Sequence, residues 1–179
     1  MKELKIDSPL NGLRLFEHRK FGDDRGLFWE LFKKSQNVIE YSFCQDNIAT
    51  SQKNVLRGLH FQKPPFDQGK LVHVIQGSVL DVVVDVRKES ETYGQWESFE
   101  LTTDNGLALW IPPGFAHGYA TFEDNTIFHY KCTNEYNPDS EGGIMWNDST
   151  LNIDWGVSEP IISSKDERNS TFVDFKTPF

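Results

Sequence analysis

The chain has 179 residues, of which 18 are Lys or Arg and 27 are Asp or Glu, so its formal net charge is -9. A chain this acidic is not expected to be a general nucleic-acid binder, because phosphate backbones are bound by an excess of Lys and Arg. The length fits one domain, residues 1–179, that buries a core of its own.

The N-terminal residues and the two cysteines show no targeting, membrane-spanning, disulfide or zinc-binding pattern. The opening MKELKIDSPL lacks the apolar run of a signal peptide, and no later run approaches the ~18 apolar residues that span a membrane. We therefore expect a cytoplasmic protein with no membrane partner. Cys44 and Cys132 form no C-x-x-C, so they indicate neither a disulfide framework nor a zinc knuckle and are expected to be reduced and structural.

Residues 27–35, LFWELFKKS, fit either a short helix or a strand. Residues 55–62, VLRGLHFQ, place His60 in an apolar strand, where a lone histidine is more typical of a buried residue than of a base or a metal ligand. Strict alternation puts Arg57 on the face opposite His60. A site that contains both side chains therefore requires a kink or bulge, which Gly58 permits.

Residues 70–87, KLVHVIQGSVLDVVVDVR, predict the clearest hairpin. In the second arm an apolar face that packs alternates with a face that carries Asp81, Asp85 and Arg87. This second face is either a wet exterior or a polar barrel lining. We favour the lining, in which Asp81 pairs with Lys70 or another cation and has no catalytic role.

The second half of the chain adds further strands. They are expected in residues 106–122 and 125–136, with a turn at 112–114 that redirects the chain, and the tail after Pro138 is expected to be irregular. Many short antiparallel strands in one domain indicate a sandwich or a closed barrel, since closure removes exposed edges.

The run IPPGFAH at residues 111–117 has the spacing P-x-G-x-x-H, which resembles the second motif of cupins, the double-sheet jelly-roll barrels. We therefore expect an all-β, cupin-like jelly roll with short peripheral helices. Many cupins bind a metal through an H-x-H pair, because alternate residues of a strand face the same side. Here that strand carries His60 and Gln62, and an amide replaces histidine poorly as a ligand, so no metal is expected.

A closer resemblance covers residues 23–166. The motifs DDRGLFWE, FCQDNIATS, VLRGLHFQ, WIPPGFAHGYA, YKCTNEY and SEGGIMWND follow one another as in the dTDP-4-dehydrorhamnose 3,5-epimerase family. The resemblance implies a cupin-like jelly roll and an isomerase that uses neither cofactor nor metal. Its implied reaction inverts C3, C5 or both in a nucleotide-linked 4-keto-6-deoxy sugar, for deoxysugars of cell-surface polysaccharides such as lipopolysaccharide.

The same resemblance implies a catalytic set of four residues. His60 would be the base, Asp166 would hold the other ring nitrogen, and Tyr130 would deliver a proton to the opposite face of the sugar. Lys70 would be the cation beside the enolate oxygen. These residue types fit the chemistry, because removing a weakly acidic hydrogen next to a carbonyl needs a base, an electrostatic partner and little water.

The resemblance further implies a substrate-binding set. Its members are Arg25, Phe28, Glu30, Gln45, Asn47, Arg57, His117, Tyr136, Glu141 and Lys165. Tyr136 would stack on the base, His117 would bond to the sugar or the enolate oxygen, and the cations would meet the diphosphate. Taken singly, the charged members are equally typical of solvated side chains or turns.

Assembly and specificity complete the expectations. The family's N-terminal segment crosses to a second subunit, so we expect a homodimer in which Arg25 and Glu30 complete the partner's nucleotide site. Ala49, His73 and Gly156 depart from the family pattern, and the first two leave the nucleotide and the sugar open. The alternatives are a nucleotide-sugar 3,4-ketoisomerase, a metal-dependent cupin and a non-catalytic sugar-binding jelly roll.

Overall fold

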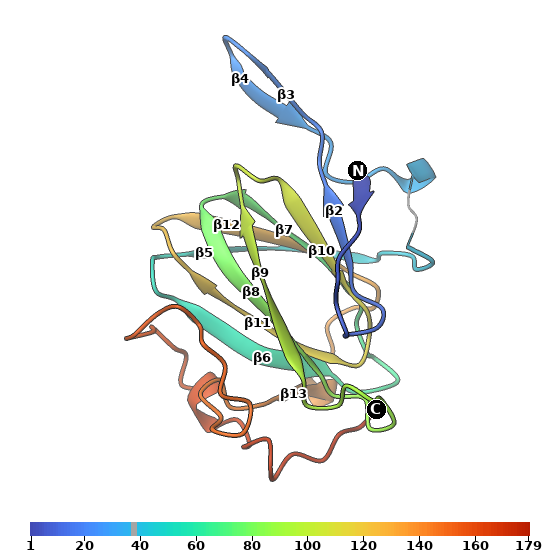
Figure 1. Ribbon diagram of the computed structural model, residues 1–179, viewed down its shortest axis with the longest axis vertical. Coiled ribbons are helices and arrows are strands. Elements are labelled where there is room, and N and C mark those ends of the chain that lie inside the picture. Colours follow the sequence, from blue (N-terminus) through green and yellow to red (C-terminus); the bar gives the residue numbers. More distant parts are fainter. Residues whose placement is uncertain (37–38) are drawn as a thin grey trace.

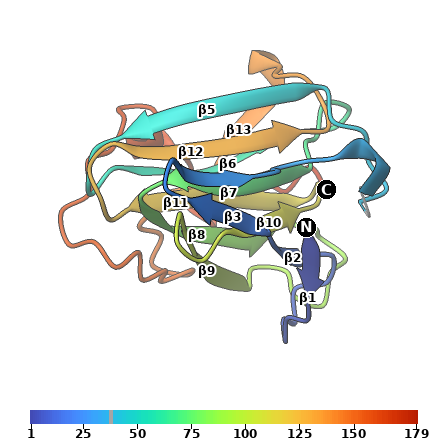
Figure 2. The ribbon, with the colours of Figure 1, turned by 90° about the horizontal axis from the view of Figure 1, so that it is seen from above.

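The computed structural model describes residues 1–36 and 39–179, and most of its strands form two facing antiparallel sheets (Figures 1 and 2). Consecutive strands often lie in different sheets, which gives the jelly-roll topology that the sequence predicts. In the described part of the chain, no helix is long and apolar enough to cross a lipid bilayer.

The larger sheet has six strands in the order β1-β2-β10-β7-β12-β5. These are β1 (Lys2–Leu4), β2 (Arg14–Glu17), β10 (Leu107–Ile111), β7 (Lys70–Gln76), β12 (Thr126–Cys132) and β5 (Gln45–Ser51). The smaller sheet has five strands in the order β13-β6-β11-β8-β9. These are β13 (Glu141–Gly143), β6 (Leu56–Gln62), β11 (Phe115–Thr121), β8 (Ser78–Asp85) and β9 (Trp96–Thr102).

A separate two-stranded hairpin projects from the barrel (Figure 1). Its strands are β3 (Lys20–Asp23) and β4 (Gly26–Trp29). The segment 27–35 thus continues a strand and then enters the short 3₁₀ helix η1 (Lys34–Gln36). The tail is largely irregular, as predicted: 3₁₀ helix η2 (Pro138–Ser140) directly precedes β13, and η3 (Asp166–Arg168) follows a long loop.

The predicted hairpin in residues 70–87 is wrong, although both of its strands exist. β7 pairs with β10 and β12, whereas β8 pairs with β11 and β9. The chain crosses between the sheets at Gly77, which has a φ of 86° and sits where a Cβ would lie 2.5 Å from Oγ1 of Thr126. Apolar alternation predicts strands but not their partners, because either pairing buries the same side chains.

β8 is buried on both faces, so the polar-lining alternative is confirmed and the wet exterior is wrong. Asp81 and Asp85 are fully buried. The opposite face packs in a cluster with Trp155, Phe172 and Phe175 of the tail, which covers what the sequence predicts only as an apolar face. This covering explains why β8 reads as a nearly continuous run of valines.

The barrel interior is apolar at one end and hollow at the other. Val74, Val83 and Leu109 belong to a buried cluster between the sheets, and each such side chain contributes roughly 1.5–3 kcal/mol by leaving water. The same cluster extends to Tyr119 and Phe128, which also line a cavity. The packed end therefore supports the walls of the open end.

The outer face of the larger sheet carries a row of histidines. Nε2 of His73 lies 2.8 Å from Nδ1 of His129, and Nε2 of His129 lies 3.1 Å from a carboxylate oxygen of Asp46. The ring of His18 meets His73 edge-on with centroids 5.5 Å apart. Burial lowers the pKa of His73 well below its usual value and also lowers the pKa of His18 and of His129, so the row is neutral at pH 7.

Candidate active site

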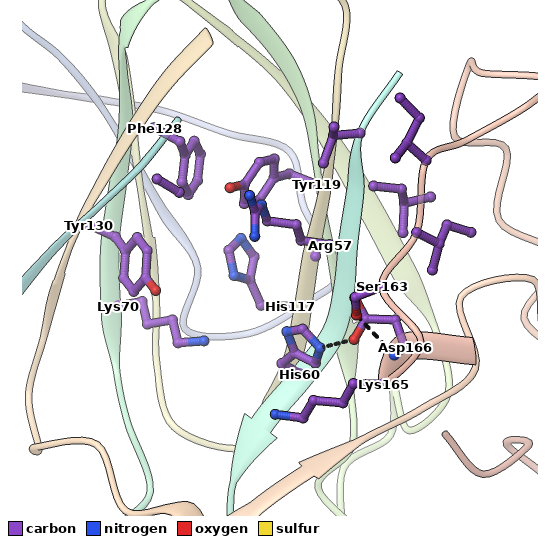
Figure 3. Close-up of a pocket in the computed structure, with 16 residues that line it drawn as sticks. Arg57, His60, Lys70, His117, Tyr119, Phe128, Tyr130, Ser163, Lys165 and Asp166 are labelled. Atoms are coloured by element: carbon purple, nitrogen blue, oxygen red, sulfur yellow. Dashed lines mark hydrogen bonds and ion pairs between the residues drawn. The ribbon is translucent and has the colours of Figure 1, made fainter. Parts of the chain in front are cut away.

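A cavity of about 550 Å³ lies inside the barrel (Figure 3). Its walls come from both sheets, and tail residues including Ile161 and Ile162 form one side. Seven of the sequence-predicted site residues line it: His60, Tyr130, Asp166, Lys70, Arg57, His117 and Lys165. The structure thus gathers the whole predicted catalytic set around one space.

His60 and Asp166 form a dyad at the tail side of the cavity. Nε2 of His60 lies 2.5 Å from Oδ1 of Asp166, and Nδ1 of His60 has no hydrogen-bond partner among the residues that the structure describes (Figure 3). Burial acts to raise the pKa of Asp166, but hydrogen bonds from His60, the Gly58 amide and Ser163 outweigh it and hold the pKa below its usual value. An ionised Asp166 accepts the Nε2 proton and leaves a lone pair on Nδ1.

A bulge in β6 brings Arg57 and His60 to the same cavity, as the alternation of the strand predicts for a shared site. His60 is opposite His117 of β11, whereas Arg57 is opposite Tyr119, so the register shifts by one residue between them. The extra residue lies at Gly58, which has a φ of 134°. A Cβ there would lie 2.5 Å from the Gly118 Cα, so glycine is required at this position.

The wall opposite His60 belongs to the other sheet and carries Tyr130 and Lys70. Nζ of Lys70 lies 5.9 Å from the centre of the Tyr130 ring. Burial raises the pKa of Tyr130, so its phenol keeps its proton at neutral pH. Burial lowers the pKa of Lys70, and nearby acidic groups oppose that shift. A proton donor and a cation therefore face the dyad across the cavity.

His117 forms a second histidine–carboxylate pair deeper in the barrel. Its Nε2 lies 2.8 Å from Oδ2 of Asp81, and the side chain of Asp81 is fully buried. Oδ1 of Asp81 has no hydrogen-bond partner among the described residues. Asp81 is predicted from the sequence to lie beside a cation, and in the structure its direct partner is the imidazole of His117.

A second cavity of about 300 Å³ adjoins the first and shares His60, Lys70 and Tyr130 with it. Four predicted substrate-binding residues line this smaller cavity: Gln45, Asn47, Tyr136 and Glu141. The Tyr136 ring is half exposed, and its hydroxyl donates to Glu141 at 2.7 Å. Nζ of Lys165 lies 2.5 Å from the same carboxylate oxygen. An exposed ring, amides and a cation thus lie next to the dyad.

Arg25, Phe28 and Glu30 are not brought to either cavity. Arg25 and Phe28 lie on the projecting hairpin, where the Arg25 guanidinium is paired with Asp23 and the Phe28 ring is 69% exposed. Glu30 follows β4 at the root of the hairpin, where its carbonyl oxygen lies 3.1 Å from Nδ1 of His18. Within this chain, these three residues are separate from the candidate site.

Sequence reasoning missed Tyr119 as a cavity residue. Its ring stacks on Phe128 with centroids 4.1 Å apart, and its buried hydroxyl has no hydrogen-bond partner among the described residues. Burial raises the pKa of Tyr119 to about 12. The signal was available, since alternate residues of a strand share a face and His117 was already placed in the site.

Comparisons with known proteins agree with this geometry. The sequence model of the family described as dTDP-4-dehydrorhamnose 3,5-epimerase matches residues 7–174. The chain is 48% identical over 168 residues to the protein of that name from Escherichia coli strain K12, covering 91% of each chain.

Two solved structures show the same similarity in space. The chain resembles RmlC, a dTDP-6-deoxy-D-glucose-3,5-epimerase from Legionella pneumophila in complex with dTDP-4-keto-L-rhamnose, with a TM-score of 0.90 and 41% identity over 96% of this chain and 93% of that one. It resembles the dTDP-4-dehydrorhamnose 3,5-epimerase of Bacillus anthracis, with TDP and PPi bound, with a TM-score of 0.89 and 42% identity over 95% of this chain and 99% of that one.

Proposed function

Because the chain belongs to the dTDP-4-dehydrorhamnose 3,5-epimerase family and is an isomerase, we propose that its cavity inverts carbons beside the ketone of a dTDP-linked 4-keto-6-deoxy sugar. The observation that carries this proposal is the placement of two proton-handling groups on facing sheets. His60 comes from β6 and Tyr130 from β12, and both line the same cavity. Inversion needs this arrangement, because a proton leaves one face of the carbon and arrives at the other.

The first step removes a proton from a carbon beside the ketone. Nδ1 of His60 takes the proton, and the electron pair of the broken carbon–hydrogen bond forms a double bond to the carbonyl carbon. The carbonyl π pair moves to the oxygen, which becomes an enolate oxygen. Asp166 stabilises the imidazolium that forms, through the 2.5 Å contact at Nε2. Lys70, which lines the same cavity, supplies positive charge near the enolate oxygen.

The second step returns a proton from the opposite face. The enolate pair forms a new carbon–hydrogen bond with the Tyr130 hydroxyl proton and leaves a phenolate. The phenolate is reprotonated and His60 loses its proton to solvent before the next turnover. The carbon is inverted, no electrons are gained or lost, and the substrate and product are isomers.

The smaller cavity is proposed to hold the nucleotide. Tyr136 offers an exposed aromatic face for the base, and Gln45 and Asn47 offer amides. Lys165, which lines the larger cavity and pairs with Glu141 of the smaller one, offers a cation for the diphosphate. An acidic chain is compatible with this ligand, because a few cations gathered in a barrel are sufficient for one diphosphate.

We also propose a homodimer. The hairpin of β3 and β4 carries exposed Phe21, Leu27 and Phe28, and such a surface fits contact with another chain. In the dimer, Arg25, Phe28 and Glu30 would complete the partner's nucleotide site, which explains why one subunit leaves them outside its own cavities. A monomer that is fully active at assay concentration would contradict this assembly.

The remaining expectations form part of the same proposal. Residues 1–179 are proposed to be a single jelly-roll domain in a cytoplasmic enzyme that makes deoxysugars for cell-surface polysaccharides. The 3,4-ketoisomerase and metal-dependent cupin alternatives lose support from Gln62, whose amide donates to the Phe66 carbonyl and accepts from the Asn137 amide. This side chain is already used in holding a loop.

Proton NMR of dTDP-4-keto-6-deoxyglucose in D2O tests the proposed reaction. With the protein present, deuterium should replace hydrogen at C3, C5 or both, and signals of the inverted sugar should appear. His60→Asn should show neither change, because the variant has no base at this position. Uptake by His60→Asn at the unaltered rate would refute the role of His60, and a non-catalytic binding protein would show no exchange at all.

A further inference from the structure

Asp81 is a fully buried carboxylate that contacts His117 of the larger cavity, and the proposed reaction gives Asp81 no role. Resting on that proposed function, we infer that Asp81 is a positioning residue: its carboxylate holds His117 in one tautomer and serves as the counter-ion of the Lys70 ammonium. It contacts neither the reacting carbons nor the base. Its effect passes through two side chains that line the cavity.

The hydrogen bond to His117 determines which ring nitrogen is available to a substrate. Nε2 of His117 lies 2.8 Å from Oδ2 of Asp81, so the carboxylate accepts the Nε2 proton. Nδ1 is then the acceptor nitrogen of the neutral ring. His117 lines the larger cavity, where this acceptor suits a sugar hydroxyl better than an enolate oxygen, which needs a donor.

Lys70 needs a counter-ion that the rest of the site does not provide. Among the described residues, no carboxylate lies within the 4.0 Å of its Nζ that defines an ion pair. The acidic groups that act on it from a distance are Cys132, Asp81 and Glu141. The counter-ion must be the one of these three groups whose negative charge is not already paired with another cation.

Two of the three are unsuitable. Burial raises the pKa of the Cys132 thiol, so it is neutral at pH 7. Glu141 already accepts from Tyr136 and pairs with Lys165 at 2.5 Å. Asp81 remains, with Oδ1 bound to no other group in the described part of the chain.

The attraction between Asp81 and the two basic groups opposes the effect of burial on each of them. Burial acts to raise the pKa of Asp81, while His117 and Lys70 act to lower it. Burial acts to lower the pKa of Lys70 and of His117, while Asp81 acts to raise both. The other titratable side chains that line the larger cavity are Arg57, His60, Tyr119, Tyr130, Lys165 and Asp166.

Asp85 provides a matched control on the same strand. It lies four residues further along β8, on the same side of the strand, and is equally buried. Its carboxylate is bound by Arg87, Ser90 and Thr92, and it does not line either cavity. Asp85→Asn therefore removes a buried charge from β8 without changing the charges that act on Lys70.

The direct test is an NMR titration of the lysine side chains, labelled with ¹³C at the ε-carbon. Lys70→Arg identifies the Lys70 signal by its loss. In Asp81→Asn, the titration midpoint of Lys70 should fall by about one pH unit or more, because a neighbouring opposite charge has been removed. In Asp85→Asn the midpoint should stay where it is, and Asp81→Glu, which keeps the charge, should restore most of the shift.

The unaltered protein supplies a second measurement, which does not depend on how the variants fold. The ¹⁵N shifts of His117 should report a proton on Nε2 and a bare Nδ1. A proton on Nδ1, or an unchanged Lys70 midpoint in a folded Asp81→Asn, would overturn the inference.

The kinetic arm separates this inference from the proposed function. The alkaline limb of deuterium exchange should move to lower pH in Asp81→Asn by the same amount as the Lys70 midpoint. A shifted midpoint with an unshifted rate profile overturns the positioning role. Absence of exchange in the unaltered protein refutes the proposed function instead, and the two NMR measurements still decide the contacts of Asp81.

Discussion

Replacing Asp166 with asparagine removes one charge from the dyad and changes little else in size. Nε2 of His60 lies 2.5 Å from this carboxylate, and donors at His60, Gly58 and Ser163 act to lower its pKa. Asparagine has one oxygen to offer, so its amide group must face at least one of those donors. If the amide NH2 group of asparagine faces His60, it donates to Nε2 and the single ring proton of neutral His60 moves to Nδ1. Nδ1 is the nitrogen that must act as the base, so the base is lost.

The expected loss follows from this contact. A hydrogen bond to a charged group contributes ~1.5–3 kcal/mol, and the 2.5 Å contact to a carboxylate that is 3% exposed lies at the strong end. Loss of about 2.7 kcal/mol from the transition state slows a step by about 10²-fold. We therefore expect Asp166→Asn to take up deuterium about 10²-fold more slowly than the unaltered chain, or slower still.

The assay is deuterium uptake by the 4-keto sugar at saturating substrate, followed by proton NMR. Asp148→Asn is the matched control, because Asp148 is a buried carboxylate of the same tail that accepts from the backbone amides of Thr150, Leu151 and Phe172. It tests whether a disturbed tail alone slows exchange. An Asp166→Asn rate within about threefold of the unaltered rate, or an equal loss in both variants, would refute the role of the dyad.

Three further outcomes are expected. Tyr130→Phe should still take up deuterium while retaining configuration, because His60 can return deuterium to the face from which it removed the proton; inversion at the unaltered rate would contradict the assignment. Prolonged chelation should leave turnover unchanged, since Gln62 is engaged with backbone, and activity restored by one added metal would argue against the proposed mechanism. The free energy of unfolding, measured in urea, should fall as the pH drops below ~6.5, because unfolded His73 binds a proton more readily than the buried residue does, by up to about 1.4 kcal/mol per pH unit. A flat profile between pH 7 and 5 would show that the histidine row is not buried neutral.

The sequence predicts the strands and most of the cavity because these depend on local pattern. Alternation identifies β7 and β8, and the same rule predicts the bulge between Arg57 and His60 once both are required in one site. Strand pairing cannot be predicted in the same way, because it depends on whether the connection between two strands is a hairpin turn or a crossing to the other sheet. A glycine such as Gly77 is typical of both connections.

Long-range contacts account for the rest of the differences. The pairing of Asp81 with His117 joins two strands 36 residues apart, and neither residue indicates the other in the sequence. Whether the apolar outer face of β8 is exposed to solvent depends on the tail, about 70–90 residues later, whose aromatic side chains cover that face. Asp166 was predicted as the partner of His60 only through the family resemblance, because the two residues lie 106 positions apart and local spacing does not link them.

The close approach of β6 and β11 limits how this site can evolve. A methyl group on Gly58 would meet the Gly118 Cα at 2.5 Å, and one on Gly118 would meet the Arg57 carbonyl oxygen at 2.7 Å. In most packed pairs, a larger side chain at one position is tolerated when its neighbour becomes smaller. Here neither partner has a side chain to lose, so a harmful change at one glycine has no suppressor at the other. The spacing between Arg57 and His60 is therefore inherited as a unit, and variation in substrate preference must come from other walls of the cavity.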